Sequence, residues 1–462
     1  MKQTLRLSWL LVLLLGGCAT YQPLPLNPHA RAPARPGDIK IDPLVLRLFP
    51  PRQHRFDPGH GLDMTDVAIL AVANNPQLKL ARDQRGIAHA QAFAAGLLPD
   101  PVLDLAHGTP TAGPAETSAF DLGLSYDVQA LLTHPLAKRA ADASAREVDL
   151  NLLWIEWQVI GKARQLFVRD VYQAKMLAVL RAETGVLAKH SAQLVAAGKM
   201  GDVSQAMIAV DLAGLQGVET RLQAAERQQL KTRQTLNALL GLSPKARLRL
   251  VGSTTIPVLD DTETEVARAL EQLPRRRPDL LALQAGYQSA DARYRQAILD
   301  QFPAIQIGFT RARDADAIYT RGFQISLTLP IFNRNRGKIA IAEATRNKLH
   351  DAYAIRVMQT RAEVQQILQI QTLLVRQRTQ LQQAVAVTSK GLTRLEKIAA
   401  KPGDVSGALR VQLQSNGFNQ RLASLTLDED LLEQQVALQT LMGGMLPIGR
   451  PVQRHRSIEG AR

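Results

Sequence analysis

A repeat of 202 residues restricts the fold of this chain more than any other feature of its 462-residue sequence. Four landmarks recur at that single offset, and a shared register of this kind indicates two copies of one structural unit. The paired landmarks are Asn75-Pro76 with Arg277-Pro278, Pro101 with Pro303, Gly201-Asp202-Val203-Ser204 with Gly403-Asp404-Val405-Ser406, and Leu240-Gly241 with Met442-Gly443.

Each copy begins with helices and then changes its hydrophobic period. Short helices are predicted at 65–74 and 264–273. Each is followed by a helix of roughly 24 residues that starts at a proline, and Asn75 is suited to cap the first of these. After Pro101 and Pro303 the period falls from 3.6 to 2, which predicts strands.

One β-hairpin is predicted in each copy, at about 101–128 and about 303–331. Strands of about 9 to 11 residues are long enough to cross a bilayer at a tilt. A half-buried hairpin of a soluble protein gives the same alternation. We expect the apolar face to contact lipid and the opposite face, with Asp121, Gln324 and Ser326, to contact water. The predicted lipid-facing residues are Leu103, Leu105, Phe120, Leu122, Leu124, Tyr126, Ile305, Ile307, Phe309, Phe323, Ile325, Leu327 and Leu329.

Two very long helices follow the hairpins. The stretches 137–197 and 337–400 contain no proline, so each can form a helix of about 60 residues, or roughly 90 Å. Coiled-coil spacing supports the second one, in which Ile367, Leu374 and Leu381 recur every seven residues. Each long helix ends at a tight turn, and Asp202 or Asp404 is predicted to cap the return helix.

The N-terminus has the features of an export signal. Lys2 and Arg6 precede a short apolar run, which is too short to span a bilayer. The run ends in Leu15-Gly16-Gly17-Cys18, which resembles the bacterial lipobox and predicts covalent lipid at Cys18. Because Cys18 is the one cysteine, a disulfide within the chain and a multi-cysteine metal site are excluded. The proline-rich residues that follow are interpreted as an extended tether.

The strand number sets a minimum size for the assembly. Four strands cannot close a barrel, and an open sheet edge is not tolerated in lipid because its backbone groups have no partners there. Two chains would give eight strands, which side chains fill, whereas three chains give twelve and leave a lumen. A conducting barrel therefore requires at least a trimer.

These features resemble the TolC-like outer-membrane factors, the exit ducts of bacterial tripartite efflux pumps. The resemblance extends over about residues 62–445. It is carried by the duplicated Gly-Asp-Val-Ser turns and by Arg276-Arg277-Pro278-Asp279-Leu280, Gln301-Phe302-Pro303-Ala304-Ile305 and Leu327-Thr328-Leu329-Pro330-Ile331-Phe332.

The resemblance implies a homotrimer in the outer membrane of a Gram-negative bacterium, with helices in the periplasm. It implies a periplasmic adaptor and an inner-membrane pump of the resistance-nodulation-division type as partners. It also assigns adaptor contact and periplasmic closure to two tips, with Asp404 as a possible lumen constriction. The tip residues are Gly198, Lys199, Met200, Gly201, Asp202, Val203, Lys401, Pro402, Gly403, Asp404 and Val405. Plain helix capping is an alternative role for Asp202 and Asp404. The residues 333–336 are expected to ring the lumen or to meet lipid head groups.

Other functions fit less well. The nine histidines are scattered without metal-ligand spacing, and the chain has no phosphate loop or nucleophile elbow, so we expect no enzyme activity, cofactor or metal. The net charge of +15 is spread along helices, and its one compact cluster lies in the C-terminal tail, so nucleic acid is not an expected partner. A lipid-anchored periplasmic adaptor or structural coiled-coil protein remains the alternative, although it leaves the amphipathic hairpins unexplained.

The predicted fold class is an α+β membrane protein with two repeats, whose trimer forms a twelve-stranded barrel continued by an α-helical barrel. The predicted boundaries are 1–17 for the signal peptide, 18–61 for the tether, 62–241 for the first repeat with its tip at about 198–203, 242–263 for the linker, 264–445 for the second repeat with its tip at about 401–405, and 446–462 for the basic tail.

Overall fold

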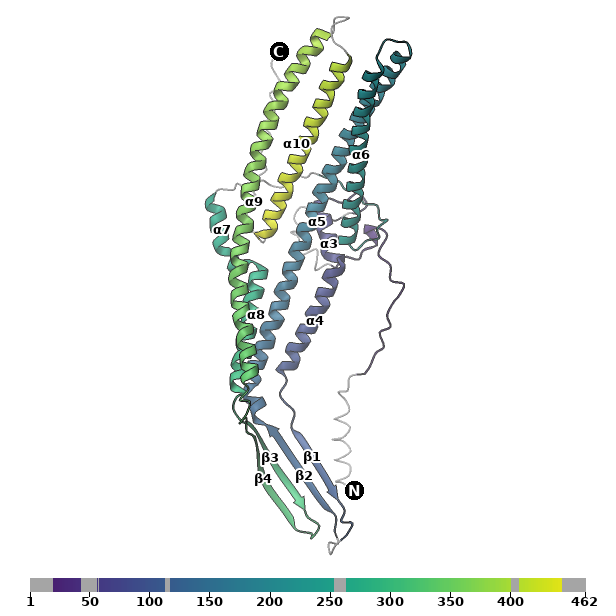
Figure 1. Cartoon of the computed structure of the whole chain (residues 1–462). Helices are drawn as coiled ribbons and strands as arrows, with labels where there is room; N and C mark the ends of the chain where they lie inside the picture. The colour runs from purple at the N-terminus through teal and green to yellow at the C-terminus, as the bar shows by residue number, and fades with distance from the viewer. Residues whose placement is uncertain are drawn as a thin grey trace.

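Long helices lie side by side in an elongated rod that ends in a four-stranded sheet (Figure 1). The computed structural model describes residues 20–42, 56, 58–112, 117–252, 263–399 and 407–442. A short 3-10 helix, η1 (Pro36–Asp38), comes first. The first repeat then contains α3 (Met64–Asn74), α4 (Pro76–Gly96), β1 (Val102–Gly108), β2 (Ala119–Asp127), α5 (Val128–Lys199) and α6 (Gln205–Leu239). The second repeat contains α7 (Glu263–Arg276), α8 (Pro278–Leu299), β3 (Ala304–Arg313), β4 (Tyr319–Thr328), α9 (Arg336–Ala399) and α10 (Gly407–Leu441).

Each copy of the repeat contains an equivalent hydrogen bond, in addition to the sequence landmarks that the two copies have in common. The side-chain amide of Asn75 donates to the carbonyl oxygen of Leu239 at 2.8 Å. The guanidinium of Arg277 donates to the carbonyl oxygen of Leu441 at 3.2 Å. Donor and acceptor are each displaced by 202 residues, so the start of the second helix is tied to the end of the last helix in both repeats.

The start of α4 follows from a capping interaction. The side-chain oxygen of Asn75 accepts hydrogen bonds from the backbone N–H groups of Gln77 and Leu78, at 2.9 and 3.0 Å. These N–H groups have no partner inside the helix, and Pro76 at the first helical position has no N–H to satisfy. The predicted N-cap is therefore confirmed. The helices α4 and α8 contain 21 and 22 residues, slightly fewer than expected.

The helix α5 starts earlier than the sequence suggests. The expected start was 137, after Pro135, whereas α5 begins at Val128 and contains Pro135. The carboxylate of Asp127 accepts from the N–H of Ala130 at 2.9 Å, which caps the helix directly at the end of β2. A proline removes one helix hydrogen bond, and here the cap and the packing of α5 against α8 outweigh that loss. At 72 residues, α5 is roughly 108 Å long.

The sheet has the order β1-β2-β3-β4, and all neighbours are antiparallel. The two hairpins of the two repeats are joined through β2 and β3, where Leu124 pairs with Phe309 and Tyr126 with Ile307. The strands β1 and β4 are therefore the edges, and neither has a second partner within the described part of the chain.

The main hydrophobic core lies at mid-height of the rod, where α3, α5 and α6 meet. Leu78, Phe167 and Leu236 are fully buried there. The N-terminal segment also packs on this core through Ile39, Ile41 and Phe56. The N–H of Ser243 donates to the carbonyl oxygen of Pro33 at 2.9 Å. The described part of the predicted tether is thus extended but held against the helices.

The second repeat has its own core, in which Val364 of α9 packs with Leu280, Leu438 and Met442. Leu374, at another of the predicted heptad positions, is also buried. No helix among the described residues has the length and apolar character needed to cross a membrane.

Candidate functional site

The strand register gathers the predicted apolar residues on one face of the sheet, here called the apolar face. Residues directly opposite each other on neighbouring antiparallel strands point to the same side. Leu103 pairs with Leu124, and Leu124 with Phe309. Phe309 pairs in turn with Phe323, with ring centroids 5.5 Å apart. Leu329 lies just after the end of β4.

The apolar face is strongly exposed in the single chain. Leu105 is 73% exposed, Phe309 64% and Phe323 57%. Soluble monomers rarely expose a continuous apolar surface of this kind, so it marks a surface that lipid or another protein covers.

Three arginines lie on the same face and were missed in the sequence interpretation. Arg311 pairs with Arg321 and with Leu122, and Arg313 pairs with Phe120 and Tyr319. The alternation through Ile305, Ile307 and Phe309 continues without a break to 311 and 313. Extending the two-residue count past the last apolar residue would have revealed them.

The opposite face of the sheet, here called the polar face, carries only small, polar or acidic side chains except at Val102. Three of its residues are Asp104, Asp121 and Asp127, and none of its positions on the described strands holds Lys or Arg. Gly123 lies opposite Asp104 and Thr310, where a side chain on it would come within 3.5 Å of the Asp104 Cβ. The polar face is therefore smooth and negatively charged.

The first helical tip is a tight turn between α5 and α6. The N–H groups of Met200 and Asp202 both donate to the carbonyl oxygen of Ala197, at 3.0 and 3.1 Å, and Gly201 has a φ of 85°. Glycine adopts this left-handed conformation without steric cost. Met200 is 72% exposed, so the tip presents an apolar side chain to its surroundings.

The cap of α6 is not the predicted Asp202. Ser204 is the N-cap, and its side-chain oxygen accepts from the N–H of Met207 at 3.3 Å. Asp202 lies two residues too early in the turn to reach the unsatisfied N–H groups of the helix. Its carboxylate is exposed at the tip.

Two predicted sites lie outside the described residues. One is the second tip, with Lys401, Pro402, Gly403, Asp404 and Val405, and the other is Cys18. The tail 446–462 lies outside as well.

The segment after β4 anchors α9 to α8. The side-chain amide of Asn335 donates to the carbonyl oxygen of Ala297 at 2.8 Å. Arg334 and Asn335 have positive φ angles of 47° and 54°, which turn the chain sharply from the sheet into α9. Asn335 is therefore a structural link between strand and helix.

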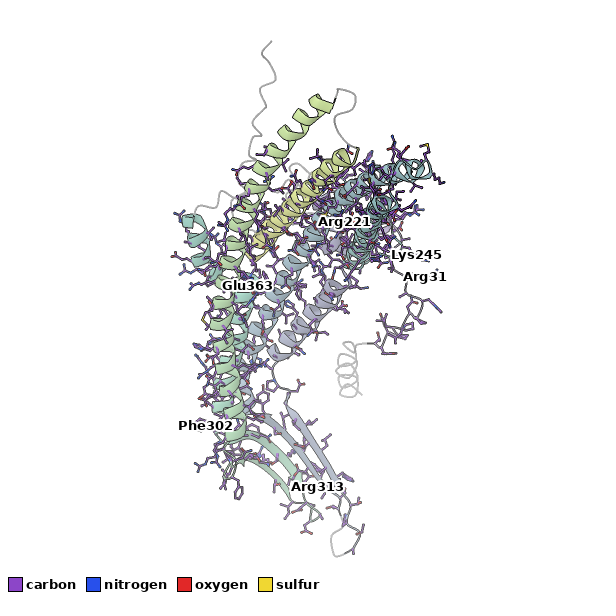
Figure 2. All side chains as sticks on the ribbon, turned by 45° about the horizontal axis from the view of Figure 1, so that its top comes forward. Arg31, Arg221, Lys245, Phe302, Arg313 and Glu363 are labelled. Carbon is purple, nitrogen blue, oxygen red and sulfur yellow. The ribbon has the colours of Figure 1, made fainter. Side chains whose placement is uncertain are left out.

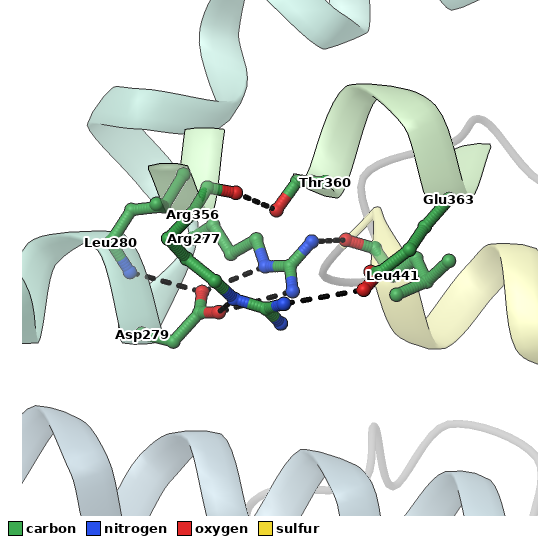
Figure 3. A network of polar contacts seen from close by, with 7 residues as sticks. All are labelled: Arg277, Asp279, Leu280, Arg356, Thr360, Glu363 and Leu441. Atoms are coloured by element: carbon green, nitrogen blue, oxygen red, sulfur yellow. Dashed lines mark hydrogen bonds and ion pairs between the residues drawn. The ribbon is translucent and has the colours of Figure 1, made fainter. Parts of the chain in front are cut away.

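A buried polar network joins three helices near the end of α10 (Figure 3). Arg277 is fully buried and donates to both carboxylate oxygens of Asp279, at 2.7 and 3.0 Å. Arg356 of α9 donates to the same carboxylate at 2.8 Å and to Glu363 at 3.3 Å. Burial lowers the pKa of the Arg277 guanidinium, and the hydrogen bonds to Asp279 oppose that shift.

A second charged cluster joins α5 to α10. Arg169 forms a bidentate pair with Glu433, at 2.8 and 2.6 Å, and lies 3.9 Å from Glu429. Burial, with the neighbouring Glu433 carboxylate, raises the pKa of Glu429 to about 7. One arginine thus faces three carboxylates, because Asp430 adjoins the cluster and also has a raised pKa, chiefly from burial.

Among the described residues, no group of three or more His, Cys, Asp or Glu side chains is placed to hold a metal ion.

The geometry defines a class of protein, a rod of paired helical hairpins with one amphipathic strand hairpin per repeat, and comparisons agree with it. Residues 269–444 match the family model described as outer membrane efflux protein. No curated protein sequence matches the chain.

Solved structures with the same fold extend over nearly the whole chain. A membrane protein from Pseudomonas aeruginosa has a TM-score of 0.67 at 19% identity, covering 92% of this chain and 100% of the other. The Campylobacter jejuni CmeC outer membrane channel has a TM-score of 0.69 at 15% identity, covering 94% and 96%. The open state of the Neisseria gonorrhoeae MtrE outer membrane channel has a TM-score of 0.64 at 18% identity, covering 85% and 91%.

Residues 269–444 therefore match the outer membrane efflux protein family, and the chain as a whole has the fold of these outer membrane channels. The resemblance expected from the sequence is confirmed, as is the predicted combination of long helices with four strands per chain.

Proposed function

We propose that three copies of this chain form an outer-membrane duct that passively conducts compounds exported from the cell. The observation that carries the proposal is the sheet itself, which has one exposed apolar face, one acidic polar face and two unpaired edges. In lipid, such a sheet must close with other copies, because backbone groups at an open edge have no partner.

The two sides of the rod suit a head-to-tail ring. The strand β1 and helix α4 lie on one side, and β4 and α9 lie on the other (Figure 1). Both helices carry exposed apolar residues, Leu80 and Phe93 on α4 and Ile341 and Met358 on α9, each at least 61% exposed. Heterologous contacts of this kind generate a closed ring when the rotation between copies closes. Three copies would give twelve strands, which is enough for an open lumen.

Aromatic residues lie at both ends of the sheet, where a membrane-spanning sheet would meet the two surfaces of the bilayer. Phe302 and Phe332, which are 58% and 91% exposed, flank the sheet at its helical end. At the far end lie Phe120 and Tyr319, whose ring centroids are 6.2 Å apart. Aromatic residues at both boundaries are typical of membrane barrels. The apolar face between them, from Leu103 to Leu329, would then contact lipid.

The helical part would continue the duct through the periplasm toward its partners. The first tip, with Met200 exposed, and the second tip around Asp404 are the proposed contacts with a periplasmic adaptor. The adaptor would in turn connect to an inner-membrane pump, for which the resistance-nodulation-division type is our expectation. Covalent lipid at Cys18 would anchor the N-terminus in the same membrane.

A pair of adjacent substitutions on β4 tests the barrel. Ile325 lies on the apolar face and Gln324 on the polar face, opposite Gly308. An arginine on a lipid-facing position costs roughly 2–4 kcal/mol at the middle of the bilayer. We expect I325R to abolish the heat-labile trimer in the outer-membrane fraction, whereas Q324R still assembles and conducts in planar bilayers with reduced current.

The rival function, a periplasmic adaptor, makes a different prediction in the same assay. An adaptor has no barrel, so the wild type would give no conductance, and the two variants would behave alike.

A further inference from the structure

The arginines of the sheet lie on one face and at one end. Arg311, Arg313 and Arg321 all belong to the apolar face, near the turns that join the strands away from the helices. Figure 2 shows Arg313 toward that far end and Phe302 where the sheet meets the helices. Arg311 and Arg321 lie two residues beyond Phe309 and Phe323, or about 7 Å along the strands.

Arg313 is held in place by neighbouring groups. Its guanidinium donates to the carbonyl oxygen of Ser118 at 2.6 Å and lies 5.7 and 5.9 Å from the ring centroids of Phe120 and Tyr319. Arg313 therefore places a positive charge beside Phe120 and Tyr319, the aromatic residues at the far end of the apolar face.

Arg311 and Arg321 are unusual because they face each other directly. They are a cross-strand pair, both exposed, and neither forms an ion pair with a carboxylate among the described residues. Like charges directly opposite each other on a sheet are destabilising. An external anion between them would remove this cost.

The sheet supplies no counter-charge on that face. Every position of the apolar face on the described strands lacks Asp and Glu, and Asp104, Asp121 and Asp127 all lie on the polar face. Closing the barrel would not change this, because the β1 strand of a neighbouring copy adds only Leu103, Leu105 and His107 to the apolar face. The described strands therefore provide no counter-charge for this pair, and an anion from outside the protein can fill that role.

We infer that Arg311 and Arg321, with Arg313 beside them, bind the phosphate groups of an anionic glycolipid in the outer leaflet. This inference rests on the proposed duct, whose orientation places the far end of the strands at the outer surface. The guanidinium fork matches phosphate geometry and forms charge-assisted hydrogen bonds with it. The position also suits a lipid, since the arginines directly follow the apolar residues that would contact its acyl chains. The site explains why arginines are placed on a face that otherwise contacts hydrocarbon.

The test compares lipid retention by the full-length protein in phosphatidylcholine nanodiscs. The nanodiscs contain either diphosphoryl lipid A or the same lipid without its phosphates, and lipid that remains bound after detergent extraction is quantified by mass spectrometry. One basic side chain near an anionic surface contributes about 1 kcal/mol, so R311Q/R321Q is expected to bind diphosphoryl lipid A roughly tenfold more weakly or worse. R311K/R321K keeps the charge and is expected to retain an intermediate amount.

The matched control is R361Q/R376Q, which removes two exposed arginines of α9 that form no ion pair with described residues. It should retain lipid A like the wild type, and no form of the protein should retain the lipid without phosphates. Equal retention by R311Q/R321Q and wild type would overturn the inference, as would an equal loss in the control or retention of the dephosphorylated lipid.

Conductance and trimer assembly, measured on the same samples, separate this inference from the proposed function. A wild type that assembles and conducts while R311Q/R321Q retains lipid normally refutes only the lipid site. A wild type that neither assembles nor conducts refutes both.

Discussion

The fully buried guanidinium of Arg277 donates two hydrogen bonds to the carboxylate of Asp279, two residues further along the chain. The pair lies at the start of α8, where the first repeat has Asn75, a neutral residue that caps α4 and donates to the carbonyl oxygen of Leu239. The second repeat has thus replaced a neutral cap with a buried ion pair that also reaches α9 and α10 (Figure 3).

Removing this arginine should be costly. R277A leaves the Asp279 carboxylate with Arg356 and the backbone N–H of Leu280 as its partners, and breaking a buried pair typically costs about 3–5 kcal/mol. The matched variant N75A removes a helix cap and the hydrogen bond to Leu239, and each of these should cost about 1 kcal/mol. Thermal unfolding followed by circular dichroism should therefore give a larger decrease in the midpoint for R277A than for N75A. Equal decreases in the unfolding midpoint would show that the Arg277–Asp279 ion pair stabilises the protein no more than Asn75 does.

Two glycines of α5 provide a second matched pair. A Cβ on Gly161 would overlap the side chain of Thr440 on α10, whereas a Cβ on Gly185 would meet nothing within 4 Å. Overpacking of a helix contact costs roughly 1–3 kcal/mol, while glycine to alanine at an open helix position gains up to about 1 kcal/mol. We expect G161A to lower the unfolding midpoint and G185A to raise it.

The double variant G161A/T440A tests whether steric overlap with Thr440 causes the destabilisation expected for G161A. It should recover part of the loss, since it removes the Thr440 side-chain atoms that the new methyl group overlaps.

The raised pKa of Glu429, about 7, predicts a pH dependence of stability. The folded protein keeps this proton while the unfolded chain releases it near its ordinary pKa of 4.5. Stability from this group is therefore full below about pH 4.5 and is lost as the pH rises to about 7. Because Glu429 is only partly desolvated, we expect E429Q to be about 1–2 kcal/mol more stable than wild type at pH 8 and to lose most of this slope.

The measurement is the unfolding midpoint at pH 5 and pH 8 for both proteins. E433Q is the contrasting variant, since it removes the bidentate partner of Arg169 and should destabilise the protein at pH 8. An unchanged pH slope in E429Q would assign the titration to another group.

The acidic polar face predicts a preference for cations in the proposed duct. Asp104 and Asp121 project from adjacent strands, and this face carries no basic residue on the described strands. We expect D104N/D121N to lower the cation-to-anion permeability ratio several-fold, measured as the reversal potential under a salt gradient. R311Q/R321Q, on the other face, should leave the ratio unchanged. If both variants changed the ratio equally, the assignment of the polar face to the lumen and of the apolar face to lipid would be wrong.

Much of the fold could be predicted because its signals are local and repeated. The Pro76 and Pro278 helix starts and the two-residue alternation of the strands follow from short-range sterics, and the 202-residue offset duplicates each signal. The apolar face could be assigned in the same way, since side chains alternate along any strand. Its extension through Arg311 and Arg321 followed the same rule and was missed because arginine ended the apolar run.

Other features depended on distances that no local pattern contains. Ser204, and not Asp202, caps α6, because the exact path of the turn between α5 and α6 decides which oxygen reaches the free N–H groups. α5 continues through Pro135, because its packing offsets one lost hydrogen bond.

The sequence alone therefore determined the duplication, through landmarks that recur at one fixed offset, and the strand hairpins and long helices, which depend on residues close together in the chain. Only the tertiary structure paired Arg311 with Arg321, tied Arg277 to Leu441 and placed Glu429 beside Arg169. The reason is physical: cross-strand register and helix packing bring together residues that no local pattern connects, and burial then shifts the pKa values of the charged groups that become enclosed.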